Sequence, residues 1–326
     1  MNNIYFKFGA VLLFFAAAPF FLQLFYINLL SEILILGIFA LSLNLLVGYT
    51  GLVSLGHAAF FGMGAYGAGL FAQHLSANVL FTLLTAVLCS IVLAGIIGLF
   101  CVKVNGFYFL MLTLAFSQMI YSFVYQTTGL TGGSNGLSGI PAPNLFGIEL
   151  SNAVWLFYFV SLMFILIYAG LRVLVKSPFG QVLIGIRENE TRLKSMGYNT
   201  SIYKYTAFVI SGAVGGLSGS LYVYFNGFIA PSDVYWTMSG AVLIMVLVGG
   251  AGTMIGPVLG AALIVLLETI VASYTDMWML IIGSVFIFFV IFFPSGIYGI
   301  WQSISSRFSK PHLQPEMKKV NRRSAQ

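Results

Sequence analysis

The sequence contains very little charge. Asp, Glu, Lys and Arg make up 7% of its 326 residues, whereas hydrophobic residues make up 60%. Soluble domains carry roughly 25% charged residues. The shortage therefore excludes an ordinary soluble enzyme or binding domain, and it indicates an integral membrane protein.

Cysteine and recognisable cofactor motifs are also scarce. Cys89 and Cys101 both fall in or beside an apolar segment, so a disulfide framework is not expected. The sequence has no metal-ligand cluster and no GxxxxGKS/T phosphate loop, so no metal or cofactor is expected and ATP cannot be bound by that loop. The net charge of +6 does not indicate nucleic-acid binding, because the basic residues occupy separate loops and a tail.

Long apolar runs take the place of the missing charge. A helix that crosses a membrane needs about 20 mostly apolar residues. Breaks at polar residues, Gly and Pro divide the chain into ten such segments: 8–29, 31–49, 52–73, 78–101, 105–126, 151–174, 205–226, 236–250, 254–272 and 278–299. The first exceeds the ~7–15 apolar residues of a secretory signal, so we expect a retained span. The expected fold is all-α with about ten transmembrane helices, or eight if a Gly-rich segment is re-entrant.

The basic residues predict an orientation, because cytoplasmic loops of membrane proteins are enriched in Lys and Arg. With both ends of the chain inside, all 14 basic residues fall on the cytoplasmic side or at its boundary. The charged residues on the external side are then four acidic ones, Glu32, Glu149, Asp233 and Asp276. We therefore expect one polytopic transmembrane domain over residues 1–306 and a basic, disordered cytoplasmic tail over 307–326, near anionic lipid.

Glycine is abundant in three segments, 48–69, 211–219 and 249–260. Each glycine costs about 1 kcal/mol relative to alanine inside a helix, so this density needs a reason. Small residues allow close packing of membrane helices, and Gly-rich breaks allow unwound backbone beside a path. Packing is the simpler interpretation, and both remain open for eight candidate pathway or packing residues: Gly51, His57, Gly62, Gly64, Gly216, Gly252, Gly256 and Glu268.

Two of these candidates are ionisable groups inside predicted spans. Ionisable groups in a membrane usually face protein or water. A single His among glycines, such as His57, is more typical of a hydrogen bond between helices than of a gate or proton relay. Glu268 lies toward the outer end of the ninth span and could simply reach the external interface. The uncharged loop 127–143 is either an external connector, or an extracytoplasmic lid or docking surface.

One charged island interrupts the apolar chain, from Lys176 to Lys204. Ser177 and Pro178 suit the start of a helix, and Gly197 suits its left-handed C-cap. The sequence between them predicts an apolar stripe on one face of the helix, formed by Leu183, Ile186, Leu193 and Met196. It also contains two acid-to-base pairs at i,i+4 spacing, Glu188–Arg192 and Glu190–Lys194. A loop that supplied only positive charge would need none of these features, so we expect a short docking helix.

Four stretches in this order resemble the LivM-type permease family of bacterial ABC importers for branched-chain amino acids. They are YTGLVSLGHAAFFGMGAY (49–66), GFYFLMLTLAF with TGGSNGLSGIP (106–141), SPFGQVLIGIRENETRLKSMGYN with KYTAFVISGAVGGLSGSLY (177–222), and LVGGAGTMIGPVLGAAL with Glu268 (247–268). The resemblance covers about Leu30 to Pro294. Asn135, where an acidic residue is common, and the polar run Lys194-Ser195-Met196 depart from the family pattern.

The resemblance implies that the island is the coupling loop, with Arg187, Glu188, Asn189, Glu190 and Gly197 matching the family's loop. It further implies a non-enzymatic transport subunit in the bacterial inner membrane. Its partners would be two ATP-binding subunits that use the ATP, a second similar permease and an extracytoplasmic substrate-binding protein. Its cargo would be leucine, isoleucine and valine.

Other functions remain as alternatives. An ABC permease for urea or other amino acids would share these features. An ion-coupled secondary transporter would need intramembrane carboxylates, for which only Glu268 is a candidate. A channel would have no need of a docking helix.

Overall fold

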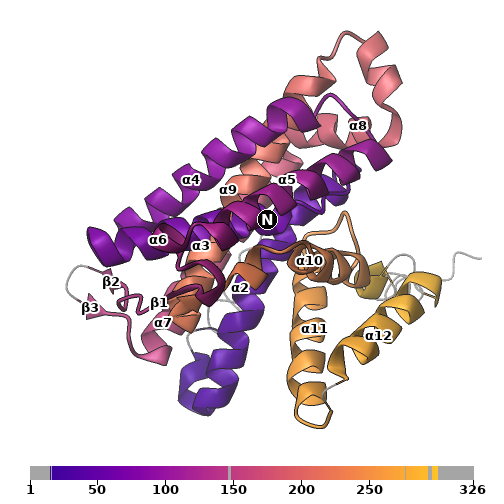
Figure 1. Cartoon of the computed structure of the whole chain (residues 1–326). Helices are drawn as coiled ribbons and strands as arrows, with labels where there is room; N and C mark the ends of the chain where they lie inside the picture. Colours follow the sequence, from indigo (N-terminus) through magenta and orange to yellow (C-terminus); the bar gives the residue numbers. More distant parts are fainter. Residues whose placement is uncertain (1–14, 16, 146–147, 276, 293–295, 300–326) are drawn as a thin grey trace, which may run out of the picture.

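The structure, a computed structural model, describes residues 15, 17–145, 148–275, 277–292 and 296–299 and is mainly helical (Figure 1). Its long helices are α2 (Leu24–Val47), α3 (His57–His74), α4 (Val79–Cys101), α5 (Phe107–Gln126), α7 (Ala153–Lys176), α8 (Pro178–Ser195), α9 (Thr200–Asn226), α10 (Trp236–Gly249), α11 (Gly256–Ala272) and α12 (Trp278–Phe292). Short elements join them: α6 (Thr128–Thr131), η1 (Gly133–Asn135), η2 (Pro231–Val234), β1 (Leu137–Ser138), β2 (Asn144–Leu145), β3 (Ile148–Glu149) and β4 (Phe228–Ile229).

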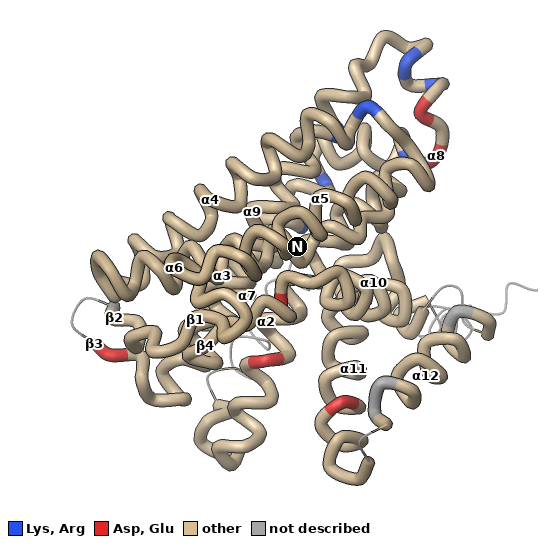
Figure 2. The backbone as a smooth tube through the Cα atoms, in the orientation of Figure 1, with Lys and Arg blue, Asp and Glu red and all other residues tan. Residues whose placement is uncertain are grey.

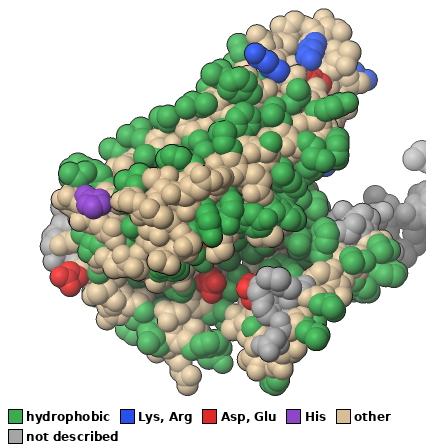
Figure 3. Space-filling view, in the orientation of Figure 1, with side chains coloured by type: hydrophobic (Ala, Val, Ile, Leu, Met, Phe, Trp, Pro, Cys, Tyr) green, Lys and Arg blue, Asp and Glu red, His purple; other side chains and the backbone are tan. Residues whose placement is uncertain are grey.

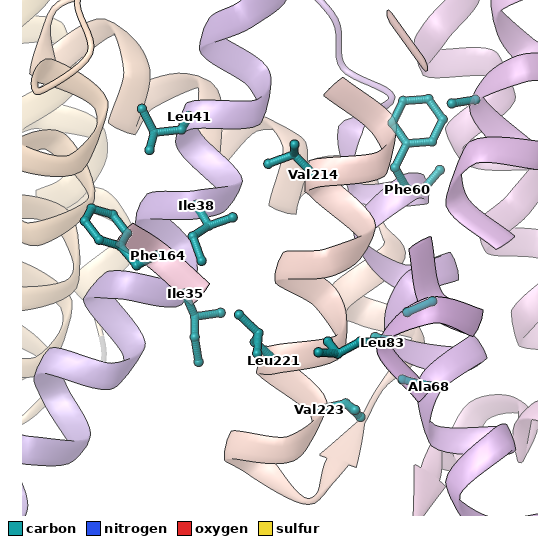
Figure 4. Close-up of a cluster of buried hydrophobic side chains, with 14 of the residues drawn as sticks. Ile35, Ile38, Leu41, Phe60, Ala68, Leu83, Phe164, Val214, Leu221 and Val223 are labelled. Atoms are coloured by element: carbon teal, nitrogen blue, oxygen red, sulfur yellow. The ribbon is translucent and has the colours of Figure 1, made fainter. Parts of the chain in front are cut away.

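Helix α9 lies at the centre of the bundle. It packs against α2, α3 and α4, while α7 covers α2. The α10–α11 hairpin packs on the other side of α2, and α12 rests on α11. Figure 4 shows side chains of α2, α3, α4, α7 and α9 meeting in the apolar core, among them Ile38, Phe60 and Leu221.

The first predicted boundary is wrong. We expected one span to end at residue 29 and the next to begin at 31, but Leu30 and Ser31 lie inside α2. Ser31 does not break the helix, because its hydroxyl donates a hydrogen bond to the Ile27 carbonyl one turn earlier, at 2.9 Å, and therefore needs no partner outside the helix. The chain instead breaks at Leu22 and Gln23, after a helical segment that ends at Phe21. Residues 8–14 and 16 of the predicted first span lie outside the described residues.

The helices from α3 to α11 that match predicted spans begin and end within about five residues of them, whereas α12 ends at Phe292 and not at the predicted 299. Five described helices are long and apolar enough to cross a membrane by length and composition, namely α2, α4, α5, α7 and α9. Helix α3 is less apolar and largely buried, and α10, α11 and α12 are shorter. The helical class is thus confirmed, whereas the count of ten spans and the N-in, C-in orientation stay predictions. The basic tail lies outside the described residues.

Charge separates to two ends of the molecule (Figure 2). The described Lys and Arg residues gather around α8, which we name the basic end, and most acidic residues outside α8 lie toward the other end, the acidic end. The face between them that Figure 3 shows carries many exposed hydrophobic side chains, and on α4 Leu88, Val92 and Leu99 are exposed. This distribution suits a protein whose flanks lie in lipid and whose ends lie in water.

Two small antiparallel ladders lie at the acidic end. In the first, β1 of the predicted external loop pairs with β4, so that Leu137 is opposite Ile229. In the second, β2 pairs with β3. The loop 127–143 is thus folded onto the end of α9, and its role as connector, lid or docking surface stays a prediction.

Candidate functional site

Helix α8 begins and ends where the sequence predicts. Ser177 accepts a hydrogen bond from the Gly180 amide, and Pro178 occupies the first turn. At the other end, Gly197 has a φ of +89°. The Tyr198 amide donates to the Leu193 carbonyl at 3.1 Å and the Gly197 amide to that of Lys194 at 3.0 Å. These two bonds form a Schellman cap, which requires the left-handed conformation that glycine adopts without strain.

The centre of α8 differs from the prediction. Asn189 is extended (φ −161°, ψ 93°) and divides the helix in two, and its side chain accepts from the Arg192 amide at 2.9 Å. The predicted Glu188–Arg192 pair is therefore not formed, because the kink lies between the two residues and disrupts the helical geometry that would bring their side chains together. The predicted stripe is also interrupted: Leu183 and Ile186 are buried, but Met196 is 66% exposed.

Glu190 ties the second half of α8 to two other segments. Its carboxylate pairs with Lys194 at 2.9 Å, as predicted, and with Lys204 at 3.0 Å. It also accepts hydrogen bonds from Thr200 and from Asn105, both at 2.9 Å. The Lys204 ammonium, at 2% exposure, donates to Asn105 as well at 2.7 Å, which closes the network. The α4–α5 connection, α8 and α9 are thereby joined at one charge cluster.

Burial alone would raise the pKa of the Glu190 carboxyl. The hydrogen bonds from Lys194, Lys204 and Thr200, with the positive charge of Lys204, outweigh that effect and lower the pKa to about 2. Glu190 is therefore an anion throughout the physiological pH range.

Arg187 ties the first half of α8 to the glycine-rich breaks. Its guanidinium Nη1 donates to the Gly48 carbonyl, in the break between α2 and α3. A Cβ atom on Gly252, in the break between α10 and α11, would lie 2.8 Å from the same nitrogen. A Cβ on Gly51 would lie 3.3 Å from the Arg187 side chain, and both glycines have positive φ. Arg187, Gly51 and Gly252, predicted separately, therefore meet at one place.

Asn44 was missed by the sequence analysis. This buried side chain on α2 donates to the Thr253 carbonyl at 2.8 Å and accepts from the Gly252 amide at 2.9 Å. A Cβ on Gly48 would lie 2.2 Å from the Asn44 Oδ1 atom and 2.4 Å from the Gly252 amide. The signal was a single amide side chain in an apolar run, four residues before a glycine.

A groove of about 830 Å³ opens on the outer side of α8. The Phe179 ring stacks on that of Tyr203 at 5.7 Å, and Tyr198 meets Tyr203 edge-on at 6.2 Å. The groove is lined by Lys176, Pro178, Phe179, Gln181, Val182, Leu193, Met196, Tyr198 and Tyr203. It is a partly exposed, largely aromatic and apolar surface with one basic side chain, Lys176.

His57 is buried in a hydroxyl network. Its Nε2 lies 2.7 Å from the Ser211 hydroxyl, which itself donates to the Ser42 carbonyl. Since that hydroxyl hydrogen is used, Nε2 must be the protonated nitrogen, and Nδ1 accepts from Ser54 at 3.3 Å. A neutral imidazole thus links α3 to α9 and α2, an arrangement that fits a packing role.

The remaining glycine candidates lie at close helix contacts. A Cβ on Gly64 would lie 2.0 Å from the Gly216 carbonyl, which brings α3 and α9 into backbone contact. A Cβ on Gly62 would lie 2.4 Å from Val234, and the Gly256 carbonyl lies 1.9 Å from where a Cβ on Gly249 would stand. The geometry supports packing for these positions. Glu268 is half-buried near the end of α11, away from the glycine cluster around Arg187.

Comparisons with known proteins identify the family. Residues 25–290 match the family described as branched-chain amino acid transport system, permease component. The LivM permease proteins of the high-affinity branched-chain amino acid transport systems of Salmonella typhimurium and Escherichia coli are each 28% identical over 311 residues, which covers 88% of this chain and 73% of theirs. A tyrosine transport system permease protein of Clostridioides difficile is 28% identical over 66% of this chain and 64% of its own. No solved structure matches.

The family match spans most of the chain and contains the whole of α8 and both glycine-rich breaks. The apolar helices, the charge separation and this match agree with one another. The chain is therefore a multi-pass membrane protein that belongs to the permease components of branched-chain amino acid transport systems.

Proposed function

We propose that the chain is the inner-membrane permease subunit of an ATP-driven bacterial importer and that α8 docks a separate ATP-binding subunit. The family membership supports the transport role. The observation that carries the docking role is the form of α8: a capped and kinked helix that holds a partly exposed aromatic groove at the basic end. By the enrichment of Lys and Arg in cytoplasmic loops, that end faces the cytoplasm, where ATP is available.

The contacts of α8 suit it to transmit movement. Glu190 attaches it to the start of α9 and to the α4–α5 connection, and Arg187 bonds Gly48 in the first glycine-rich break and packs against Gly252 in the second. A partner seated in the groove would therefore act on the start of α9, on the α4–α5 connection and on the two breaks through the contacts of α8. The complete importer would contain two ATP-binding subunits, a second permease and an extracytoplasmic binding protein.

The proposed cargo is leucine, isoleucine or valine. This rests on the LivM relatives, which are named for branched-chain amino acids. The relative named for tyrosine transport makes an aromatic amino acid a second candidate.

Co-purification of the ATP-binding subunit tests the docking claim. Tyr198→Ala removes a ring from the groove, and we expect the recovery of the ATP-binding subunit to fall about tenfold, as for a residue that anchors an interface. Tyr125→Ala is the matched control, since Tyr125 is similarly exposed (47% against 41%) but lies at the end of α5 away from α8. Equal recovery from Tyr198→Ala and Tyr125→Ala would contradict docking at α8.

A further inference from the structure

The two glycine-rich breaks are joined to each other at the basic end. Residues 48–56 between α2 and α3 and residues 250–255 between α10 and α11 are far apart in the sequence. Asn44 holds them together with its donor and its acceptor, at 2.8 Å to the Thr253 carbonyl and 2.9 Å from the Gly252 amide. Because Asn44 is 1% exposed, breaking either bond would leave a buried amide group without a partner.

Each break is locally ordered. The Thr50 hydroxyl donates to the Leu46 carbonyl at 2.5 Å, and the Leu52 amide donates to the same carbonyl at 3.0 Å. In the second break, the Thr253 hydroxyl donates to the Gly250 carbonyl at 2.8 Å and accepts from the Gly256 amide at 3.0 Å. Each break is therefore a compact turn held by its own hydrogen bonds. If the two breaks moved apart, each would keep its shape, and the Asn44 hydrogen bonds that join them would be the ones to open.

Arg187 lies across this contact from outside. It bonds Gly48 in the first break and leaves no room for a Cβ on Gly252 in the second. Arg187 itself is exposed, so it connects the two breaks to α8 from the outer surface of the protein. Movement of α8 would reach the breaks through this side chain.

We propose that Asn44 and Arg187 together seal the basic end of the membrane domain. Asn44 is the inner bond between the α2–α3 and α10–α11 breaks, and Arg187 is a positioning residue that fixes the joined breaks to α8. The inference rests on the proposed function only in placing this contact on a transport path. The seal itself requires neither a particular cargo nor a particular energy source.

Labelling of a buried thiol tests the seal. Ser54, in the first break, is fully buried. The reporter is full-length Ser54→Cys with Cys89 and Cys101 replaced by Ala, in inside-out membrane vesicles without ATP, treated with a membrane-impermeant maleimide. We expect Asn44→Ala to raise the labelling rate at least tenfold, because both buried hydrogen bonds across the contact are lost. Arg187→Met should raise it several-fold, with little further increase in the double variant, because both residues act on one contact.

Two matched controls separate the seal from general loosening. Arg192→Ala removes an exposed positive charge from the same helix, and Gly240→Ala adds a Cβ to α10 where nothing lies within 4 Å. Both should label at the parent rate, and Met196→Cys, an exposed site, should label fast in every background. Should Asn44→Ala fail to insert, the exposed Arg187→Met carries the test together with Gly48→Ala.

The seal would be overturned if the labelling rate stayed at the parent value in Arg187→Met and in every Asn44 or Gly48 variant that inserts. It would also be overturned if the labelling rate rose equally in the Arg192→Ala and Gly240→Ala controls. The labelling assay uses no ATP and no cargo. If labelling changes as expected but ATP-driven uptake is not observed, the proposed function is contradicted and the seal is not.

Discussion

Glu190 shows how one side chain can decide the position of a whole helix. Its carboxylate connects α8 with the start of α9 and with the α4–α5 connection, and Lys204, its partner, is almost fully buried. Removing one member of a buried ion pair leaves the other charge uncompensated, which is costly.

We predict that Glu190→Gln loosens the second half of α8. Loss of the negative charge should cost about 3 kcal/mol locally, because the Lys204 ammonium loses its counter-charge. Hydrogen exchange of the amides of residues 190–200 should become faster by at least tenfold. Glu188→Gln, on the exposed side of the same helix, should exchange as the parent does. Equal exchange in Glu190→Gln and the parent would show that the network does not hold α8.

The same carboxylate predicts a pH response. Its pKa is lowered to about 2 from the ordinary 4.5, so its contribution to stability is complete above about pH 4.5 and is lost only as the pH falls through about 2. Protection of these amides, corrected for intrinsic exchange rates, should therefore be constant between pH 5 and 8. A fall in protection between pH 7 and 5 would contradict the assignment.

His57 supports a different kind of prediction, because its two ring nitrogens bond the hydroxyl groups of Ser54 and Ser211. Both ring nitrogens are occupied and the ring is fully buried. His57→Ala should reduce stability by about 2–4 kcal/mol through a cavity and unpaired serines. Transport by the fraction that folds should keep the parent's pH dependence. A changed pH profile of uptake would instead identify His57 as a titrating group.

At the scale of elements, close contact of α3 and α9 depends on positions without a side chain. A Cβ at Gly64 would stand 2.0 Å from the Gly216 carbonyl, so Gly64→Ala must push the helices apart. Overpacking of this kind costs about 1–3 kcal/mol and should lower the apparent unfolding temperature in detergent by about 5 °C. Gly170→Ala on α7, where nothing lies within 4 Å, is the control and should unfold as the parent does. Equal unfolding temperatures would contradict backbone contact.

The end of α8 offers a second test at this scale. Gly197 adopts a φ of +89°, which proline cannot reach, and its amide bonds the Lys194 carbonyl. Gly197→Pro should therefore abolish the Schellman cap, recovery of the ATP-binding subunit and uptake, while membrane insertion persists. Normal uptake by Gly197→Pro would show that the cap is dispensable.

Most helix limits could be predicted from the sequence, because long apolar runs and capping residues act locally. The ends of α8 followed from Ser177, Pro178 and Gly197 in this way. The continuity of α2 through Ser31 could not be predicted, since a serine hydroxyl can either break a helix or bond within it. The kink at Asn189 was missed for a similar reason: its side chain caps the second half of α8.

The candidate site was predictable residue by residue but not as an arrangement. Arg187, Gly51 and Gly252 were each identified, yet their meeting depends on how α2, α8 and α10 pack, which spacing along the chain does not contain. Asn44 was missed because its two bonds reach across 208 and 209 residues. Long-range polar contacts of this kind leave no local periodicity to read.

At the scale of the whole molecule, the separation of charge gives the chain two unlike ends. The basic end holds α8 and its groove, and the acidic end holds the small ladders and several carboxylates. An importer needs such asymmetry, because one end must meet an energy source and the other its cargo.

The source of energy tests the central claim most directly. Leucine uptake should be measured in proteoliposomes that contain the purified complex and the binding protein, with no proton or sodium gradient. The account predicts uptake when ATP is supplied on the side of the basic end and none without it, with or without Glu268→Gln. Uptake driven by an ion gradient in the absence of ATP, and lost in Glu268→Gln, would contradict the account.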